Sequence, residues 1–186
     1  MGSGWMNIGR LLATALLAAL PIAAPAGAAE APAFRGAIGQ FTLAAEPRPA
    51  PTLPFQDGTG REVTFADFRG KLVLVNLWAT WCAPCVKEMP ALDRLRAKMA
   101  SSDVVVLALS SDRGGAKQVE PFLKKHGVEG LGVWVETKGA IPRAFAARGL
   151  PTTILLDRQG NEIGRLEGDA EWDGEAAVAL LRHYLE

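Results

Sequence analysis

The chain contains only two cysteines, Cys82 and Cys85, and both lie in the short segment WCAPC. Two thiols at this spacing can alternate between a dithiol and a disulfide, because a thiolate attacks a disulfide sulfur through a mixed-disulfide intermediate. Cys82 is expected to attack, and Cys85, nearly one helical turn later, is placed to resolve the mixed disulfide. The pair therefore predicts thiol–disulfide exchange as the chemistry of the chain.

The residues on either side of the cysteines predict a strand followed by a helix. Residues 71–79 (KLVLVNLWA) are apolar at alternating and intervening positions, which is typical of a strand buried on both faces. From Cys85 to Ala100, apolar residues recur at spacings of three and four and form one helical stripe. Cys82 would then lie at the helix N-terminus, where free N–H groups and the helix dipole favour a thiolate. Pro84 suits the first turn of such a helix.

Three other uses of a cysteine pair are less well supported. A purely structural disulfide would close a loop of about four residues, which stabilises a chain by only ~2 kcal/mol. Covalent haem attachment needs a histidine directly after the second cysteine, and that position is Val86. A structural zinc site needs about four ligands, and the two histidines, His126 and His183, lie apart in separate predicted helices.

Equal numbers of acidic and basic residues leave the chain with no net charge, and no basic face suggests nucleic acid as a partner.

The N-terminus has the pattern of a targeting segment. After Arg10, residues 11–24 form a short apolar core followed by small residues, as in a signal peptide. Residues 1–29 are thus expected to be a signal peptide, with Met6 as an alternative start, or an N-terminal membrane anchor. Either would place the rest in the periplasm or cell envelope.

Residues 30–51 are rich in alanine and proline and predict a linker before a domain at 52–186. Such a linker would also suit a membrane tether. Within that domain, alternating patterns predict an α/β fold. Strands are expected at 53–56, 62–64, 104–110, 133–135, 152–157 and 162–166, and helices at 117–126 and 175–184. The order of strand, helix and strand around the cysteines implies a parallel crossover.

These pieces together resemble the TlpA/ResA-like group of exported thiol–disulfide oxidoreductases. The resemblance rests on the segment from Trp78 to Cys85 (WATWCAPC), on Glu88 three residues later, on Pro90 in the helix and on residues 150–153 (LPTT). Residues 168–173 (GDAEWD) make TlpA the nearer subgroup. The group has a three-layer thioredoxin-like fold, in which helices flank a central mixed sheet, and it needs no cofactor.

The resemblance also implies roles for individual residues. It implies that the residues around the two sulfurs contact the substrate, namely Trp81, Ala83, Pro84, Leu150 and Pro151. It also implies that the peptide bond between Leu150 and Pro151 is cis. Typical thioredoxins carry a buried aspartate six residues before the first cysteine, where this chain has Asn76. The proton-transfer group is then expected to be Glu88, one turn after Cys85. Without the resemblance, Glu88 could be a solvated helix charge and Trp81 a core residue.

By the same resemblance, the chain is expected to reduce disulfides in envelope proteins. The expected substrates are factors that assemble the copper site of cytochrome oxidase, namely a Sco-like copper chaperone and the copper-binding oxidase subunit. A membrane protein of the DsbD/CcdA type would resupply electrons. Apocytochrome c, as substrate of a maturation reductant, remains an alternative, as do a disulfide-donating oxidase and a Cu(I)-binding chaperone, because soft thiolates select Cu(I).

Overall fold

Strand β4 (Leu72–Trp78) lies in the middle of an eight-stranded sheet with the strand order β1-β8-β7-β4-β5-β6-β2-β3. It pairs in parallel with β5 (Val104–Ser110) and antiparallel with β7 (Thr152–Leu156), so the sheet is mixed. Every residue of β4 is buried, as a strand covered on both faces requires. The prediction of a doubly buried strand before the cysteines is confirmed.

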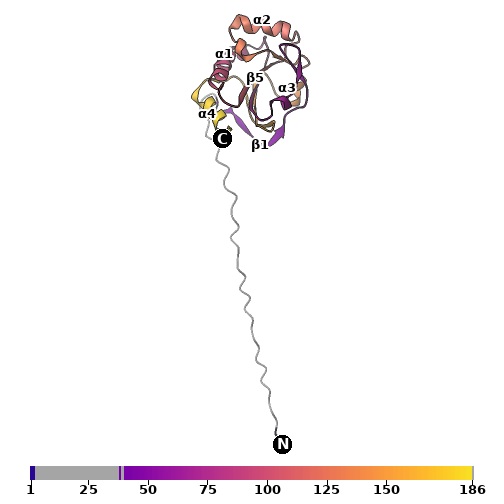
Figure 1. The fold of residues 1–186 in the computed structure, drawn as a ribbon, viewed down its shortest axis with the longest axis vertical. Helices are drawn as coiled ribbons and strands as arrows, with labels where there is room; N and C mark the ends of the chain where they lie inside the picture. The colour runs from indigo at the N-terminus through magenta and orange to yellow at the C-terminus, as the bar shows by residue number, and fades with distance from the viewer. Residues whose placement is uncertain (3–37, 39, 186) are drawn as a thin grey trace. The chain divides into compact units, whose positions relative to one another are not determined.

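The structure is a computed structural model that describes residues 1–2, 38 and 40–185 (Figure 1). The other strands are β1 (Thr42–Pro49), β2 (Phe55–Asp57), β3 (Glu62–Val63), β6 (Trp134–Val135) and β8 (Asn161–Glu167). The helices are α1 (Ala83–Lys98), α2 (Ala116–His126), α3 (Ala140–Ala144) and α4 (Glu175–His183), with 3-10 turns η2 (Phe65–Phe68) and η3 (Glu129–Leu131). Residues 3–29 of the predicted signal peptide or anchor, and residues 30–37 and 39 of the predicted linker, lie outside the described residues. Within the described ones, no helix has the length and apolar character needed to cross a membrane.

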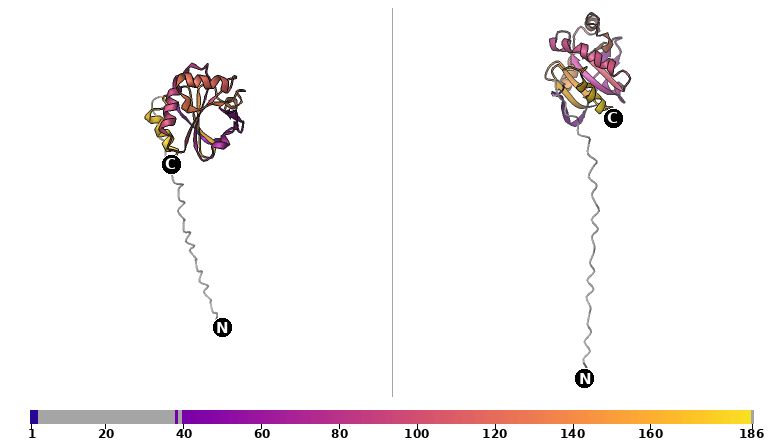
Figure 2. Two further views of the ribbon diagram at one scale, coloured as in Figure 1. Left: turned by 45° about the horizontal axis from the view of Figure 1, so that its top comes forward. Right: turned by 90° about the vertical axis from the view of Figure 1, so that its left-hand side faces the viewer.

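Two hydrophobic clusters cover the two faces of the sheet. On one face Leu72, Leu74 and Trp78 of β4 pack with apolar residues of α1, α2 and α4. On the other face the alternate β4 residues pack with η2 and α3. Figure 1 shows α1 and α4 on the side of the sheet away from α3, and Figure 2 gives two further views of the arrangement. The predicted three-layer thioredoxin-like fold is confirmed.

Most predicted elements lie where the sequence placed them, and β1 is the main exception. The sequence predicts a linker over 30–51, but β1 pairs antiparallel with β8 at the edge of the sheet. Its side chains are almost all exposed, so no alternating pattern marks it as a strand. Backbone hydrogen bonds hold it, and its prolines are tolerated because the strand lies at an edge.

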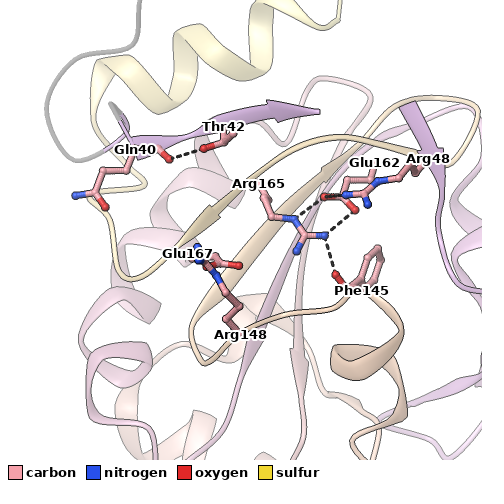
Figure 3. Close-up of polar contacts among 8 residues, drawn as sticks. All are labelled: Gln40, Thr42, Arg48, Phe145, Arg148, Glu162, Arg165 and Glu167. Carbon is pink, nitrogen blue, oxygen red and sulfur yellow. Dashed lines mark hydrogen bonds and ion pairs between the residues drawn. The ribbon is translucent and has the colours of Figure 1, made fainter. Parts of the chain in front are cut away.

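An ion pair between the half-buried Arg165 and the buried Glu162 links β8 to the end of α3 (Figure 3). Arg165 donates two hydrogen bonds to Glu162, from Nε to Oε1 at 2.6 Å and from Nη2 to Oε2 at 2.8 Å. Its Nη2 also donates to the carbonyl of Phe145 at 2.8 Å. Arg48 of β1 approaches the same carboxylate at 3.8 Å. Glu162 is thus a buried charge with its partners in place, as burial of a charge requires.

Candidate active site

The two cysteines form a disulfide at the junction of β4 and α1, with their Cα atoms 5.3 Å apart. Cys82 is the N-cap of α1, and Pro84 lies in the first turn. The predicted placement of Cys82 at a helix N-terminus, with Pro84 in the first turn, is confirmed, and the helix begins at Ala83. Both sulfur-bearing residues are buried in the cluster beneath α1, whereas Trp81, Ala83 and Pro84 are exposed.

Glu88 is buried one turn after Cys85, with 3% of its surface exposed. Three N–H groups donate to its carboxylate. Asn76 Nδ2 donates to Oε1 at 2.8 Å, while the Trp172 indole Nε1 and the Ala170 backbone N donate to Oε2 at 2.7 and 3.1 Å. The alternative of a solvated surface charge is therefore wrong for Glu88.

Burial raises the pKa of Glu88 from the ordinary value of 4.5 to about 7. Desolvation is the largest cause, because it penalises the charged form. The bonds from Trp172, Asn76 and Ala170 act in the opposite direction, and the nearby charge of Asp169 adds to the rise. A carboxyl group with a pKa near neutrality can both take up and release a proton under ordinary conditions.

A hollow of about 410 Å3 opens beside Glu88 and is lined by charged residues from α1 and the segment before α4. Lys87 pairs with Asp169 across it at 3.2 Å. Arg94 pairs with Asp173 at 2.7 Å, which lowers the pKa of Asp173. The two ion pairs link α1 to the segment that supplies Ala170 and Trp172, so they help to hold the N–H donors against Glu88.

The peptide bond between Leu150 and Pro151 is cis, as the resemblance implies. Pro151 is buried and Leu150 is half-buried directly before β7. The carbonyl of Pro151 accepts a hydrogen bond from Gly168 N at 2.9 Å. This bond joins the turn before β7 to the end of β8, close in sequence to Ala170 and Trp172.

Asp112 is a buried acid beside the active site that the sequence analysis did not identify. It lies just beyond β5 with 1% of its surface exposed. It accepts bonds from Thr80 N at 2.8 Å, Thr80 Oγ1 at 2.7 Å, Ser110 Oγ at 2.8 Å and Gln118 Nε2 at 2.8 Å. These bonds fix the loop two residues before Cys82. The one signal in the sequence was a polar residue that follows a buried strand.

Trp81 is 72% exposed, so the alternative of a core residue is wrong for Trp81. It borders a hollow of about 480 Å3 together with Arg113, Lys138 and Arg143. Of these, Arg143 donates to the backbone carbonyl of Lys138 at 2.9 Å. The exposed indole forms an apolar surface beside the buried Cys82.

The two histidines considered as zinc ligands lie at helix ends. His126 stacks on Phe122, with ring centroids 4.2 Å apart, and His183 contacts Tyr184. Across the part of the chain that the structure describes, no three or more histidine, cysteine, aspartate or glutamate side chains gather into a possible metal site.

Comparison with known proteins assigns the chain to a family. A family model described as the AhpC/TSA family matches residues 47–167. The thiol-disulfide oxidoreductase ResA of Bacillus thuringiensis subsp. konkukian (strain 97-27) is 33% identical over 120 residues, 64% of this chain and 68% of that protein. The thioredoxin-like protein YneN of Bacillus subtilis (strain 168) is 34% identical over 116 residues, 62% of this chain and 67% of that protein.

Solved structures agree with this assignment. A Chlorobium tepidum protein assigned as the thiol:disulfide interchange protein DsbE is 28% identical, with a TM-score of 0.66 over 76% of this chain and 98% of that one. The exposed lipoprotein thioredoxin Etrx1 of Streptococcus pneumoniae strain TIGR4 is 26% identical, with a TM-score of 0.60 over 70% and 97%. The chain therefore belongs to the AhpC/TSA family and, within it, to the thioredoxin-like thiol-disulfide oxidoreductases of the ResA and YneN kind.

Proposed function

We propose that this oxidoreductase works as a reductant of disulfides in envelope proteins. The Cys82 thiolate attacks a substrate disulfide, forms a mixed disulfide and releases one substrate thiolate. Cys85 loses its proton and attacks the Cys82 sulfur, which forms the Cys82–Cys85 disulfide and releases the second thiolate. Two electrons pass to the substrate, and the two cysteines of this chain are oxidised.

The observation that carries the proposal is the buried carboxyl group of Glu88 one turn after the buried Cys85. A buried thiol ionises reluctantly, because desolvation disfavours the thiolate. A carboxyl group with a pKa of about 7 is matched to take that proton near neutral pH. We infer that Glu88 accepts the Cys85 proton as the mixed disulfide is resolved.

The direction of electron flow is tested by the equilibrium redox potential of the Cys82/Cys85 pair in the full chain, measured against dithiothreitol. A value near thioredoxin's, about −270 mV, supports the reductant. A value near that of DsbA, about −120 mV, would make the protein a disulfide donor and overturn the direction. The Cys85→Ser variant is the control, since it should trap a mixed disulfide at Cys82 without completing the exchange.

The proposed substrates are a Sco-like copper chaperone and the copper-binding subunit of cytochrome oxidase, with apocytochrome c as the alternative. The test is a direct comparison of rates, in which the reduced protein is mixed with each oxidised substrate under the same conditions. Faster reduction of the copper proteins supports copper-site assembly, and faster reduction of apocytochrome c supports cytochrome maturation. Equal and slow rates for all three would contradict both assignments.

We further propose that the segment 1–29 exports the protein or anchors it in the membrane, and that a membrane donor of the DsbD/CcdA type reduces its disulfide again. The apolar run at residues 11–24 supports export. Fractionation of cells, followed by N-terminal sequencing, distinguishes a cleaved signal from a retained anchor. Recovery of the full chain in the cytoplasm would contradict both.

A further inference from the structure

Asn76 lies between Glu88 of α1 and Thr153 of β7 and bonds to both through its side-chain nitrogen. Its Nδ2 donates to Glu88 Oε1 at 2.8 Å and to Thr153 Oγ1 at 2.9 Å. Its Oδ1 is buried without a hydrogen bond among the residues that the structure describes. Asn76 and Thr153 are also direct cross-strand partners in the β4–β7 pair. No hydrogen bond at the position of Oδ1 therefore fixes which end of the Asn76 amide occupies it.

The other donors around Glu88 cannot adapt to its protonation. Trp172 Nε1 and Ala170 N both face Oε2, and each is a donor only. A proton on Oε2 would therefore meet two N–H groups. A proton gained by the carboxylate must lie on Oε1, where the facing group is Asn76.

An asparagine amide can present either a donor or an acceptor when it turns by half a rotation. A threonine hydroxyl can likewise donate or accept. Asn76, which faces Glu88 Oε1, and Thr153, which accepts a hydrogen bond from Asn76, can therefore suit either protonation state of the carboxyl. The present arrangement, with Nδ2 facing Oε1, suits the ionised form.

We propose that Asn76 is a positioning residue that reverses its side-chain amide when Glu88 gains a proton. In the protonated state the Glu88 hydroxyl on Oε1 donates to Asn76 Oδ1. The Thr153 hydroxyl turns to donate to the same oxygen, and Nδ2 moves to the place that Oδ1 now occupies. No bond is made or broken other than hydrogen bonds, and the only proton gained is the one that Glu88 takes up.

The charged groups that face Glu88 are few and mostly paired. From α1 and the segment before α4 they are Lys87, Arg94, Asp169, Glu171 and Asp173. Lys87 pairs with Asp169 and Arg94 with Asp173. Asn76 of β4, which faces Glu88, and Thr153 of β7, which bonds to Asn76, are neutral. Among these groups, Glu88 is the one that hydrogen-bonds to Asn76, so a change in its charge acts directly on the Asn76 amide.

The inference deepens the proposed role of Glu88 and rests on it for its functional meaning. If Glu88 collects the Cys85 proton, Asn76 supplies a hydrogen-bond partner both before and after the transfer. The reversal also passes the protonation state to Thr153, two residues after Pro151. The turn proposed to contact the substrate is thereby linked to the proton-transfer group.

The direct test is a pH titration of the oxidised, isotope-labelled full chain by NMR, which involves no redox turnover. The nuclear Overhauser contact between the Asn76 side-chain N–H protons and the Thr153 methyl group should weaken as the pH falls. The pH midpoint of this weakening should match the midpoint at which the chemical shift of the Glu88 carboxyl carbon titrates. In Glu88→Gln, whose amide N–H can donate to Asn76 as the protonated acid would, the low-pH pattern should persist at every pH. An unchanged contact in the native protein while Glu88 titrates would overturn the proposal.

A second measurement separates a reversing amide from a fixed donor. Trp172→Phe removes a donor that favours the ionised form, so it should raise the pKa of Glu88 by roughly one unit. Asn76→Leu removes a group that bonds to both the ionised and the protonated form of Glu88. It should therefore change the pKa of Glu88 by less than half of the rise expected for Trp172→Phe. Equal rises in the two variants would identify Asn76 as a fixed donor and overturn the switch. If Asn76→Leu fails to fold, the NMR titration of the native protein still shows whether the Asn76 amide reverses. None of these results depends on the direction of electron flow, so failure of the switch leaves the proposed function intact.

Discussion

The indole nitrogen of Trp172 lies 2.7 Å from Glu88 Oε2 and donates a hydrogen bond to it. The two residues belong to distant parts of the chain, since Glu88 is on α1 and Trp172 precedes α4. Trp172 is itself buried, so this bond is made in a low-dielectric setting where it counts strongly. The segment before α4 therefore takes part in setting the acidity of the group beside Cys85.

Trp172→Phe should move the pH dependence of thiol–disulfide exchange upward by roughly one unit. The phenyl ring keeps most of the buried bulk but leaves Oε2 with the Ala170 N–H alone, so the ionised form of Glu88 loses stabilisation. Stopped-flow rates with a disulfide substrate between about pH 5 and 9 measure the shift. Trp134→Phe is the matched control, because the indole of Trp134 on β6 donates to the Leu131 carbonyl of η3 and not to Glu88. A profile that moves equally in both variants would contradict the prediction.

Glu88 should make the folded protein less stable as the pH rises. Its pKa is raised from 4.5 to about 7 in the folded state, mainly by desolvation. Between these values the folded chain holds a proton that the unfolded chain has lost, so the free energy of unfolding falls with increasing pH and levels off by about pH 8. The full shift corresponds to about 3 kcal/mol.

The measurement that isolates this effect is urea unfolding of the native protein and of Glu88→Gln at several pH values. Other acids titrate in both proteins, so only the difference between the two is informative. The free energy of unfolding of Glu88→Gln, relative to that of the native protein, should increase from about pH 5 to about pH 8. A constant difference would show that the pKa of Glu88 is not raised on folding.

The sequence was sufficient to predict the central layers of the fold. A strand covered on both faces must be apolar throughout, and β4 and β5 carry that signal within their own residues. The cysteines and Glu88 could be placed as well, because a three-residue spacing on one helix fixes their relation to each other. These predictions needed only local geometry.

The rest depends on contacts between distant segments. Strand β1 is held by backbone hydrogen bonds to β8, and these bonds leave no pattern in its exposed side chains. Trp172 and Asp112 reach the active site only because α4 and β5 dock against α1 and β4. Periodicity and short-range spacing carry no information about which distant donor meets which acid, so neither residue was identified as part of the site.

Asp112→Asn should destabilise the loop before Cys82. The carboxylate of Asp112 accepts from Thr80, Ser110 and Gln118, and an amide would place its own N–H protons against one of these donors. The expected loss is about 1–3 kcal/mol in the free energy of unfolding. Asp103→Asn is the control, because Asp103 is exposed and its pair with Arg158 at 3.6 Å should contribute little. Similar losses in the two variants would show that the buried network does not hold the loop.

Trp81→Ala should impair exchange with protein substrates while leaving exchange with dithiothreitol nearly unchanged. The side chain is 72% exposed, so its removal costs the fold little, but a docked chain would lose an apolar contact beside Cys82. A loss of about tenfold in kcat/KM corresponds to ~1.4 kcal/mol, the size expected for a central aromatic contact. Trp81→Phe should restore most of the activity, since it keeps a flat apolar surface at the same place. Equal losses with both kinds of substrate would instead mean that Trp81 acts on the sulfur chemistry and not on the contact with the substrate.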